Sequence, residues 1–351
     1  MIYDVCIIGG GINGVSTALQ CADNKYSTIL FEKNTLGCGA SSKTSKLAHG
    51  GLRYLERLEL SLVKECLVER NYLLDTYPEL VTPMPFVFPI YKDQSALKMW
   101  AGLKIYDYLA KGTKMPRSRK LSIEETKLYI PWLDTTNIKC CFMYYDAVMK
   151  DKDIVITVAN KARQLGAEIF SEEGVVKTTS TEDYVTVNTN KRSIRCKVLV
   201  NVTGAWNKEH ASPSKGVHII TNKLKAKAAT ILINPDDGRA FFTIPYNNTT
   251  IIGTTDEPYT GDPDDVRVTM AEKQYVLKAI NNFCIQDISS ANIIGEYAGL
   301  RPLAKDVTKD GSRDTSIHSS GRIVSMVGGK FTTHRAMSEE VINYVQLFLR
   351  T

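Results

Sequence analysis

The 351-residue chain lacks any run of about 18 consecutive apolar residues, so no segment is expected to cross a membrane as a helix. We also expect no leader peptide, because Val5 to Ile8 already form an apolar strand pattern. Internal repeats and low-complexity tracts are absent as well. These absences favour a globular protein, and we expect it in the cytoplasm.

No C-x-x-C pair occurs among the eight cysteines, which argues against zinc and thioredoxin-like motifs. Cys6 and Cys21 fall within apolar segments and are expected to be small buried thiols. The neighbouring Cys140 and Cys141 admit a metal or redox site, but adjacent cysteines rarely bind one ion. We therefore expect reduced thiols and no metal.

The excess of positive charge is only +6, and no basic module interleaved with aromatic residues appears, so no nucleic-acid partner is expected. This charge suits an anionic substrate or an anionic membrane surface. A helical pattern over 93–111 has Trp100, Leu103 and Tyr106 near one face, with lysines around it. The pattern indicates either a helix for peripheral contact at the inner face of the membrane, or a surface helix whose apolar side packs in the core.

The chain is rich in glycine where it begins, directly after the first apolar strand. Gly9, Gly11 and Gly14 have the G-x-G-x-x-G spacing that allows a tight turn, close approach to a pyrophosphate and helix–strand packing. A helix expected over about 12–22 would direct its positive N-terminus at the phosphates. Glu32 ends the next apolar run. In this motif, an acidic residue at that position accepts a hydrogen bond from a ribose hydroxyl of the cofactor. This pattern predicts an ADP-containing cofactor, with either nicotinamide or flavin.

Periodicity predicts several further elements. Helices are expected over about 60–77, 151–166 and 333–349, and strands over 184–189, 194–201 and 322–327. Segments 217–220, 228–233, 240–245 and 250–255 indicate an antiparallel sheet, with Asn247 and Asn248 in a hairpin turn. Prolines at 78, 83, 85 and 89 are expected to break the chain and to mark a change of domain.

Four short segments carry polar groups that a buried core does not require, namely 49–54, 299–302, 312–314 and 328–333. In the last of these, Gly328 and Gly329 precede a helix, and Lys330 adds positive charge. The arrangement suits an anion or the N1–C2=O edge of a reduced flavin. An ordinary strand–helix connection with an exposed lysine would have the same sequence.

Several motifs together resemble the FAD-dependent glycerol-3-phosphate dehydrogenase/oxidase family. They are His49-Gly-Gly-Leu-Arg-Tyr-Leu-Glu56 with the Ser-Ser-Lys-Thr-Ser-Lys46 loop before it, Asn201-Val-Thr-Gly-Ala-Trp206, Ile252-Gly-Thr-Thr-Asp256, Gly299-Leu-Arg-Pro-Leu303 and Gly328-Gly-Lys-Phe-Thr-Thr333. The motifs follow the family's order and extend over nearly the whole chain. The helical C-terminal domain of many members is not part of this sequence.

The resemblance implies an α/β fold (an α+β flavoprotein of two domains). The FAD-binding domain would be Rossmann-like, of the glycine-oxidase/glutathione-reductase type, and built from 1–84, 141–212 and 297–351. An antiparallel-sheet substrate domain would comprise 85–140 and 213–296.

The resemblance also assigns residues to the cofactor FAD. Gly9, Gly11, Gly14 and Glu32 would bind its ADP half, and Ser41, Ser42, Ser45 and Lys46 would lie near the pyrophosphate and flavin. Gly204 would form a second turn near the nucleotide, and Gly328, Gly329, Lys330 and Thr332 would line the flavin. Arg53, Tyr54, Arg301 and Arg313 would hold a phosphorylated small-molecule substrate, since guanidinium groups bind phosphate through paired hydrogen bonds.

The implied reaction is oxidation of sn-glycerol 3-phosphate to dihydroxyacetone phosphate, with hydride transfer to flavin N5. The base that takes the hydroxyl proton is His49 or His218, and Lys330 joins them as a catalytic candidate. For His210, His318 and His334, solvated or capping roles suffice. Electrons would pass to quinone or oxygen. Alternatives are a related flavoenzyme acting on a 2-hydroxy acid or amino acid, and a flavin-binding protein without catalysis.

Overall fold

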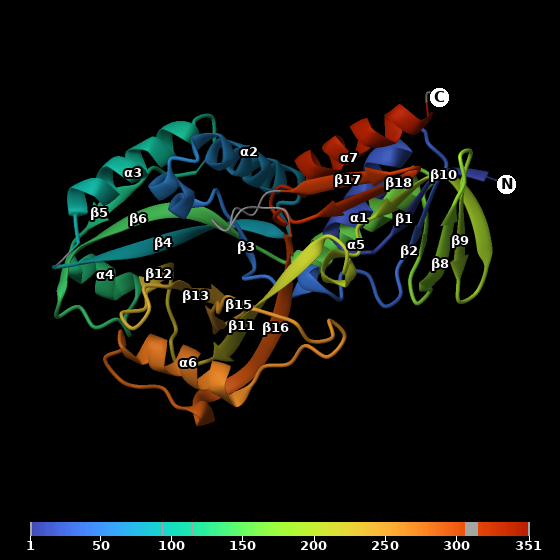
Figure 1. Cartoon of the computed structure of the whole chain (residues 1–351). Helices are drawn as coiled ribbons and strands as arrows, with labels where there is room; N and C mark the ends of the chain where they lie inside the picture. Colours follow the sequence, from blue (N-terminus) through green and yellow to red (C-terminus); the bar gives the residue numbers. More distant parts are fainter. Residues whose placement is uncertain (1, 93, 114, 306–314, 350–351) are drawn as a thin grey trace.

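The strands of the chain form two sheets that lie side by side, each with helices packed against it (Figure 1). This computed structural model describes residues 2–92, 94–113, 115–305 and 315–349. The alternation of strands and helices confirms the expected α/β class.

The first sheet is mainly parallel and has the strand order β17-β18-β10-β1-β2-β7. Its parallel strands are β1 (Ile2–Ile8), β2 (Thr28–Phe31), β7 (Glu168–Phe170), β10 (Ser193–Asn201) and β18 (Ile323–Val327). β17 (Ser316–Ser320) is an antiparallel edge strand, and the hairpin of β8 (Val175–Ser180) and β9 (Val185–Thr189) extends from β10. The central strand β1 therefore pairs with a strand from the middle of the chain.

Three helices cover one face of this sheet: α1 (Ile12–Asp23), α5 (Asp151–Gln164) and α7 (His334–Leu349). Small residues of α1, Val15 and Ala18 among them, are fully buried and let the helices approach closely. On the opposite face, Val185 and Val187 of β9 pack against Cys6 of β1. The parallel sheet is thus buried on both faces, as its continuous apolar runs require.

The second sheet is mainly antiparallel and has the order β15-β11-β14-β13-β12-β4-β6-β3, with β16 added at β11 and β5 at β6. Its strands are β3 (Leu47–Ala48), β4 (Val81–Tyr91), β5 (Arg119–Leu121), β6 (Ile138–Met149), β11 (Ala211–Thr221), β12 (Ala229–Ile233), β13 (Ala240–Tyr246), β14 (Thr249–Gly253), β15 (Glu257–Pro258) and β16 (Ile293–Ala304). Asn247 and Asn248 form the β13–β14 turn with positive φ values of 48° and 60°, as their sequence predicts.

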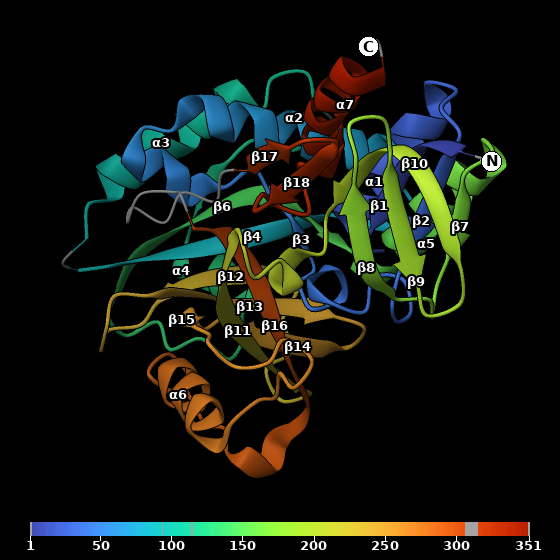
Figure 2. The ribbon, with the colours of Figure 1, turned by 45° about the vertical axis from the view of Figure 1, so that its right-hand side comes forward.

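Helices lie on both sides of the second sheet (Figures 1 and 2). α2 (Leu60–Thr76) and α3 (Ala96–Leu109) cover one side, and α4 (Ile123–Tyr129) and α6 (Met270–Asn281) lie on the other. Capping boxes at Ser122 and Thr269 begin α4 and α6. Short 3₁₀ segments complete the chain: η1 (Ala40–Ser42), η2 (Leu52–Arg57), η3 (Gly204–Trp206) and η4 (Ser290–Asn292).

The expectation that prolines break the chain is wrong for three of the four. Pro83, Pro85 and Pro89 all lie within β4, which pairs with β6 along its whole length. The three prolines all occupy odd-numbered positions. Because successive N–H groups of a strand point to opposite edges, the missing N–H groups of the prolines fall on the same edge of β4. At that edge β12 pairs only with Phe86 and Val87. Both β4 and β6 belong to the second sheet from end to end.

The helix expected over 93–111 is α3, and its faces differ in part from the expectation. Leu103 and Tyr106 are buried, whereas Leu97 and Trp100 are 73% and 49% exposed. Apolar side chains therefore lie on its outer face as well as its inner face. In the part of the chain that the structure covers, no helix combines the length and apolar character needed to cross a bilayer.

Candidate functional site

A glycine turn at the carboxyl end of β1 forms the first part of the site. Gly9 has φ +110°, and a Cβ atom there would lie 2.7 Å from the Val202 carbonyl oxygen. A Cβ atom on Gly14 would lie 1.8 Å from the Gly9 carbonyl oxygen. Gly11 caps α1 without a side-chain hydrogen bond. Two of the predicted glycines are thus required by packing, and the third adds no side chain of its own at the helix N-terminus.

Glu32 lies at the end of β2, directly beside this turn. One carboxylate oxygen accepts a hydrogen bond from the Gly10 amide at 2.6 Å, and the other accepts one from the Asn34 amide at 2.8 Å. These contacts fix the carboxylate at the carboxyl ends of parallel strands, where cofactors bind in such sheets. Each carboxylate oxygen has two lone pairs, so further hydrogen bonds to ribose hydroxyls are available.

The loop 41–46 joins the glycine turn to the second sheet. The Ser41 hydroxyl accepts a hydrogen bond from the Ile12 amide at 2.9 Å, at the start of α1. The Lys46 ammonium lies 2.8 Å from both Asp151 carboxylate oxygens and donates to the Ser42 carbonyl at 2.7 Å. Asp151 is buried at the N-terminus of α5, where the helix dipole also favours its charge. The loop is therefore held at both ends.

One face of β11 and β16 packs against this loop. In the register of the two strands, Ser214 lies opposite Arg301 and His218 lies opposite Tyr297. The Tyr297 hydroxyl donates to the Thr44 carbonyl at 2.8 Å. A Cβ atom on Gly299, between Arg301 and Tyr297 on that face, would lie 2.7 Å from Lys43 Cβ. Strand register thus brings two predicted residues, His218 and Arg301, to the same place as the loop.

His218 is buried in the centre of this face. Its Nε2 lies 2.9 Å from the Ser45 hydroxyl, and its ring stacks on Tyr297 with centroids 4.6 Å apart. Burial, with the nearby charges of Arg301 and Lys46, lowers the pKa of His218 to about 3. The imidazole is therefore neutral near pH 7. Its Nδ1 is buried and has no hydrogen-bond partner among the described residues.

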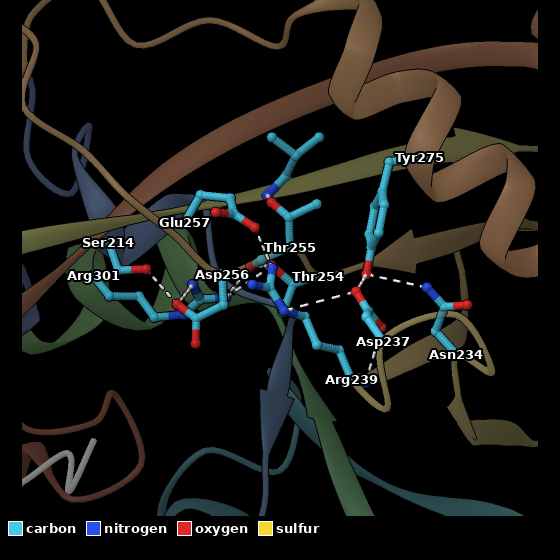
Figure 3. A network of polar contacts seen from close by, with 11 residues as sticks. Ser214, Asn234, Asp237, Arg239, Thr254, Thr255, Asp256, Glu257, Tyr275 and Arg301 are labelled. Atoms are coloured by element: carbon cyan, nitrogen blue, oxygen red, sulfur yellow. Dashed lines mark hydrogen bonds and ion pairs between the residues drawn. The ribbon is translucent and has the colours of Figure 1, made fainter. Parts of the chain in front are cut away.

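Arg301 belongs to a polar network at the edge of the same face (Figure 3). Its guanidinium donates to the Thr254 hydroxyl at 2.8 Å, to the Thr255 carbonyl at 3.1 Å and to Asp256 at 3.0 Å. Asp256 also accepts from the Ser214 hydroxyl. The network thus orients one guanidinium group beside His218.

Two further candidate residues, Lys330 and Tyr54, lie together in the structure. The Lys330 ammonium is 4.1 Å from the centre of the Tyr54 ring and donates to the buried Cys66 thiol at 3.3 Å. Burial raises the pKa of that thiol, and Lys330 opposes the increase. Gly328 and Gly329 have φ values of +92° and +76°, so the turn before Lys330 needs glycine.

The remaining candidates occupy separate positions. His49 follows β3 and is half-buried, and Arg53 lies exposed on η2. Gly204 begins η3 with φ +58°, and Thr332 is buried before α7. Arg313 lies outside the described residues.

Another histidine differs from the expectation of a solvated or capping role. His334 is fully buried at the start of α7, with Nδ1 2.9 Å from the Ser16 hydroxyl.

Several residues of the site were missed by sequence reasoning. They are Gly10, Cys66, Asp151, Thr254, Asp256 and Tyr297. Thr254 and Asp256 stand within a motif quoted for the family resemblance, and this position was the one available signal. Gly10 stands within the glycine motif itself, and Cys66, Asp151 and Tyr297 become apparent only from contacts between distant segments.

The arrangement fits an extended dinucleotide cofactor. The turn at 9–14 exposes a helix N-terminus, and the buried Asn13 Oδ1 beside it has no hydrogen-bond partner within the described chain. Glu32 supplies acceptors on one side, and the loop 41–46 continues toward the second sheet. Across the residues that the structure covers, no three His, Cys, Asp or Glu side chains gather as metal ligands, and the eight cysteines carry no disulfide.

Comparison with known proteins adds a family match. The family model described as "FAD dependent oxidoreductase" matches residues 4–340. The chain is 36% identical to glycerol-3-phosphate dehydrogenase of Pseudomonas tolaasii, over 97% of this chain and 71% of that protein. It is 33% identical to D-erythritol 1-phosphate dehydrogenase of Brucella abortus, over 96% of this chain and 72% of that protein.

A solved structure has the same fold. The glycerol-3-phosphate dehydrogenase from Bacillus halodurans, complexed with FAD, matches with a TM-score of 0.80 and 25% identity. The match covers all of this chain and 65% of that one.

Proposed function

The chain belongs to the family of FAD-dependent oxidoreductases, and from this premise we propose that it oxidises sn-glycerol 3-phosphate to dihydroxyacetone phosphate. It is a flavoenzyme with FAD as its cofactor. The curated relative named glycerol-3-phosphate dehydrogenase supports the substrate. The observation that carries the proposal is the pairing of a neutral, buried His218 with the oriented guanidinium of Arg301 on one sheet face.

The proposed FAD site follows the first sheet. Gly9, Gly11 and Gly14 with Glu32 hold the ADP half, and the loop 41–46 continues toward the flavin. The expected domains, 1–84, 141–212 and 297–351 against 85–140 and 213–296, remain our proposed division. Its boundaries at 84 and 140 fall within β4 and β6.

In the proposed reaction, Arg301 binds the substrate phosphate, aided by Arg53 and Arg313. Tyr54 and Lys330, which lie together, orient the substrate close to the flavin ring. Bound FAD supplies the acceptor for the hydride that leaves C2. Positioning of a substrate in this way lowers the activation free energy of a reaction by several kcal/mol. The fixed orientation of the Arg301 guanidinium therefore contributes to the proposed reaction in addition to its charge.

His218, rather than His49, is the proposed base for the C2 hydroxyl proton. The substrate phosphate carries about −1.5 to −2 charges at neutral pH. Bound beside Arg301, it would offset the cation that helps to lower the His218 pKa. The imidazole would therefore become a stronger base when substrate is present. Ser45 at Nε2 keeps the ring in place during the transfer.

The experiment that tests this function is anaerobic reduction of the bound flavin by a panel of substrates. We expect glycerol 3-phosphate to bleach the flavin absorbance faster than glycolate, lactate or glycine at equal concentration. Bleaching by a hydroxy acid or amino acid alone would contradict the proposal, and a flavin that no substrate reduces would indicate a non-catalytic protein.

A second candidate substrate is a four-carbon polyol phosphate, which the relative named D-erythritol 1-phosphate dehydrogenase favours. Erythritol 1-phosphate therefore belongs in the same panel. Stopped-flow reoxidation by oxygen and by a soluble quinone would then identify the electron acceptor.

We also propose peripheral membrane contact through the outer face of α3. Leu97, Trp100 and Tyr108 are exposed there, and Lys98 and Lys111 lie exposed beside them. An apolar face bordered by lysines binds anionic lipid surfaces. Cosedimentation with anionic vesicles should be lost in a Leu97→Ser/Trp100→Ser variant and kept in Leu128→Ser, which alters an exposed leucine on α4. Equal sedimentation of both variants would refute the contact.

A further inference from the structure

A buried charged cluster lies behind the segment 49–54, which carries two of the proposed substrate-binding residues. Asp146 of β6, Arg70 of α2 and Tyr106 of α3 are 1%, 1% and 2% exposed. Arg70 Nη1 lies 2.8 Å from an Asp146 carboxylate oxygen, and the Tyr106 hydroxyl lies 2.7 and 2.9 Å from the two carboxylate oxygens. We name these three residues the Asp146 cluster.

The Asp146 cluster is connected to the segment through one backbone amide. β3 pairs with β6 through Ala48 and Ala147, which brings the next residues of the chain past Asp146. The Gly50 amide then donates to the Asp146 carboxylate at 3.1 Å. The carboxylate thus holds the chain directly between His49 and Gly51.

Packing fixes the same point from the other side. A Cβ atom on Gly50 would lie 2.4 Å from the Tyr106 hydroxyl oxygen and 2.4 Å from Leu67 Cδ2. The backbone of Gly50 therefore packs directly against the Asp146 cluster. Any side chain at position 50 would push this backbone away from the cluster. Gly51, with φ +74°, then turns the chain into η2, where Arg53 and Tyr54 lie.

Stability alone does not explain this cluster. Replacing a buried ion pair by apolar residues of the same volume is often neutral or stabilising, because desolvation offsets the attraction. Arg70 Nε also has no hydrogen-bond partner in the described parts of the chain, which adds to the cost. A buried pair with these features is better explained by the geometry that it imposes.

We propose that Asp146, held by Arg70 and Tyr106, is a positioning group that fixes the Gly50 amide and so sets the orientation of Arg53 and Tyr54 toward the substrate. This inference rests on the proposed function, which places these two side chains against a phosphorylated substrate. None of the three residues of the Asp146 cluster touches the reacting atoms in this proposal. Their effect passes through the backbone of 49–54.

The test uses the FAD-loaded full chain with Tyr106→Phe, which removes one hydrogen bond and leaves the ion pair intact. We expect the Gly50 amide to exchange its hydrogen faster than in wild type. Mass spectrometry of peptides spanning 47–55 measures this exchange. The KM for glycerol 3-phosphate should rise about two- to tenfold, the factor that one hydrogen bond corresponds to, while kcat stays within about twofold.

The matched control is Tyr91→Phe. The Tyr91 hydroxyl is also buried, but it has no hydrogen-bond partner among the described residues, and it lies on β4 in another part of the core. This control should change neither the exchange of the Gly50 amide nor KM. A second variant, Asp146→Asn, keeps the shape and should increase both effects; if it fails to fold, Tyr106→Phe still decides the question.

Exchange at Gly50 equal to wild type in Tyr106→Phe would overturn the inference. Faster exchange with an unchanged KM would overturn the connection to the substrate. These outcomes are distinct from failure of the proposed function, in which wild type itself would not oxidise glycerol 3-phosphate. Hydrogen exchange would then still report whether the Asp146 cluster holds Gly50.

Discussion

In the proposed function, Arg301 is oriented for the substrate phosphate before the substrate binds. It is 22% exposed and already paired with Asp256, whose side chain is 55% exposed. Ion pairs open to solvent contribute little to stability, typically about 0–1 kcal/mol. A phosphate group can therefore replace the Asp256 contact at small cost, while Thr254 and the Thr255 carbonyl keep the guanidinium oriented.

Replacing Arg301 should damage binding more than folding. We expect Arg301→Ala to raise the KM for glycerol 3-phosphate by about 100-fold, because the substrate phosphate loses a paired charge. Arg239→Ala is the matched control, since Arg239 makes ion pairs with Glu257 and Asp237 in the neighbouring part of the network (Figure 3). Steady-state kinetics of both variants measure the effect, and an equal KM in the two would remove Arg301 from the phosphate site.

The sequence alone could nominate His218 and His49 but could not rank them. What separates them is burial and the Ser45 and Tyr297 contacts, which depend on the register of β11 with β16. That register pairs residues some eighty positions apart, and no local pattern encodes it. Cys66 was missed for the same reason, because Lys330 reaches it from the far end of the chain.

At the scale of elements, the strand–turn–helix unit of β1 and α1 was fully predictable. Its apolar run, glycine spacing and helical periodicity are all local, and each occurs where the sequence predicts it. β4 was not predictable by the same means. A proline in a sequence predicts a break in a strand. The edge of β4 that faces β12 has few ladder hydrogen bonds, so three prolines there remove no hydrogen bond between β4 and its neighbours.

Gly14 gives this unit a sharp test. A Cβ atom there would lie 1.8 Å from the Gly9 carbonyl oxygen, so Gly14→Ala must displace the turn that we propose to bind the pyrophosphate. We expect purified Gly14→Ala to contain little FAD and to unfold about 1–3 kcal/mol more easily, as overpacked cores do.

Gly102→Ala is the control for Gly14→Ala. Gly102 lies within α3, and a Cβ atom on it would have no neighbour from another described segment within 4 Å. Alanine should keep full FAD content there and stabilise the helix by about 0.5–1 kcal/mol. Flavin absorbance per protein and urea unfolding measure both variants, and full FAD content in Gly14→Ala would show that the turn tolerates a side chain.

The stability of the whole molecule should depend on two buried histidines. Burial lowers the pKa values of His218 and His334 to about 3, with nearby cations as the second cause. In the unfolded chain a histidine has a pKa near 6.5, so between about pH 6.5 and 3 the unfolded state binds more protons. The contribution of each histidine to the free energy of unfolding is therefore fully present above about pH 6.5 and is lost as the pH falls toward 3.

Each such histidine should contribute a slope of up to about 1.4 kcal/mol per pH unit in this range. We expect His334→Asn to flatten the pH dependence of the free energy of unfolding between pH 6.5 and 4.5 relative to wild type. Urea denaturation at several pH values measures it. Parallel curves for the two proteins would show that His334 is not held neutral in the folded state.

The pairing of β1 with β10 and of β10 with β18 has a consequence for the order in which the protein forms. Ile2 pairs with Arg195, and Leu199 pairs with Ile323, so the first sheet needs segments from both ends of the chain. During synthesis, β1 can pair early with β2, but its other edge stays unpaired until β10 has left the ribosome. Long-range parallel pairing of this kind is slow, and it leaves strand edges open to aggregation meanwhile. Chaperone supply should accordingly limit the yield of soluble protein during rapid expression.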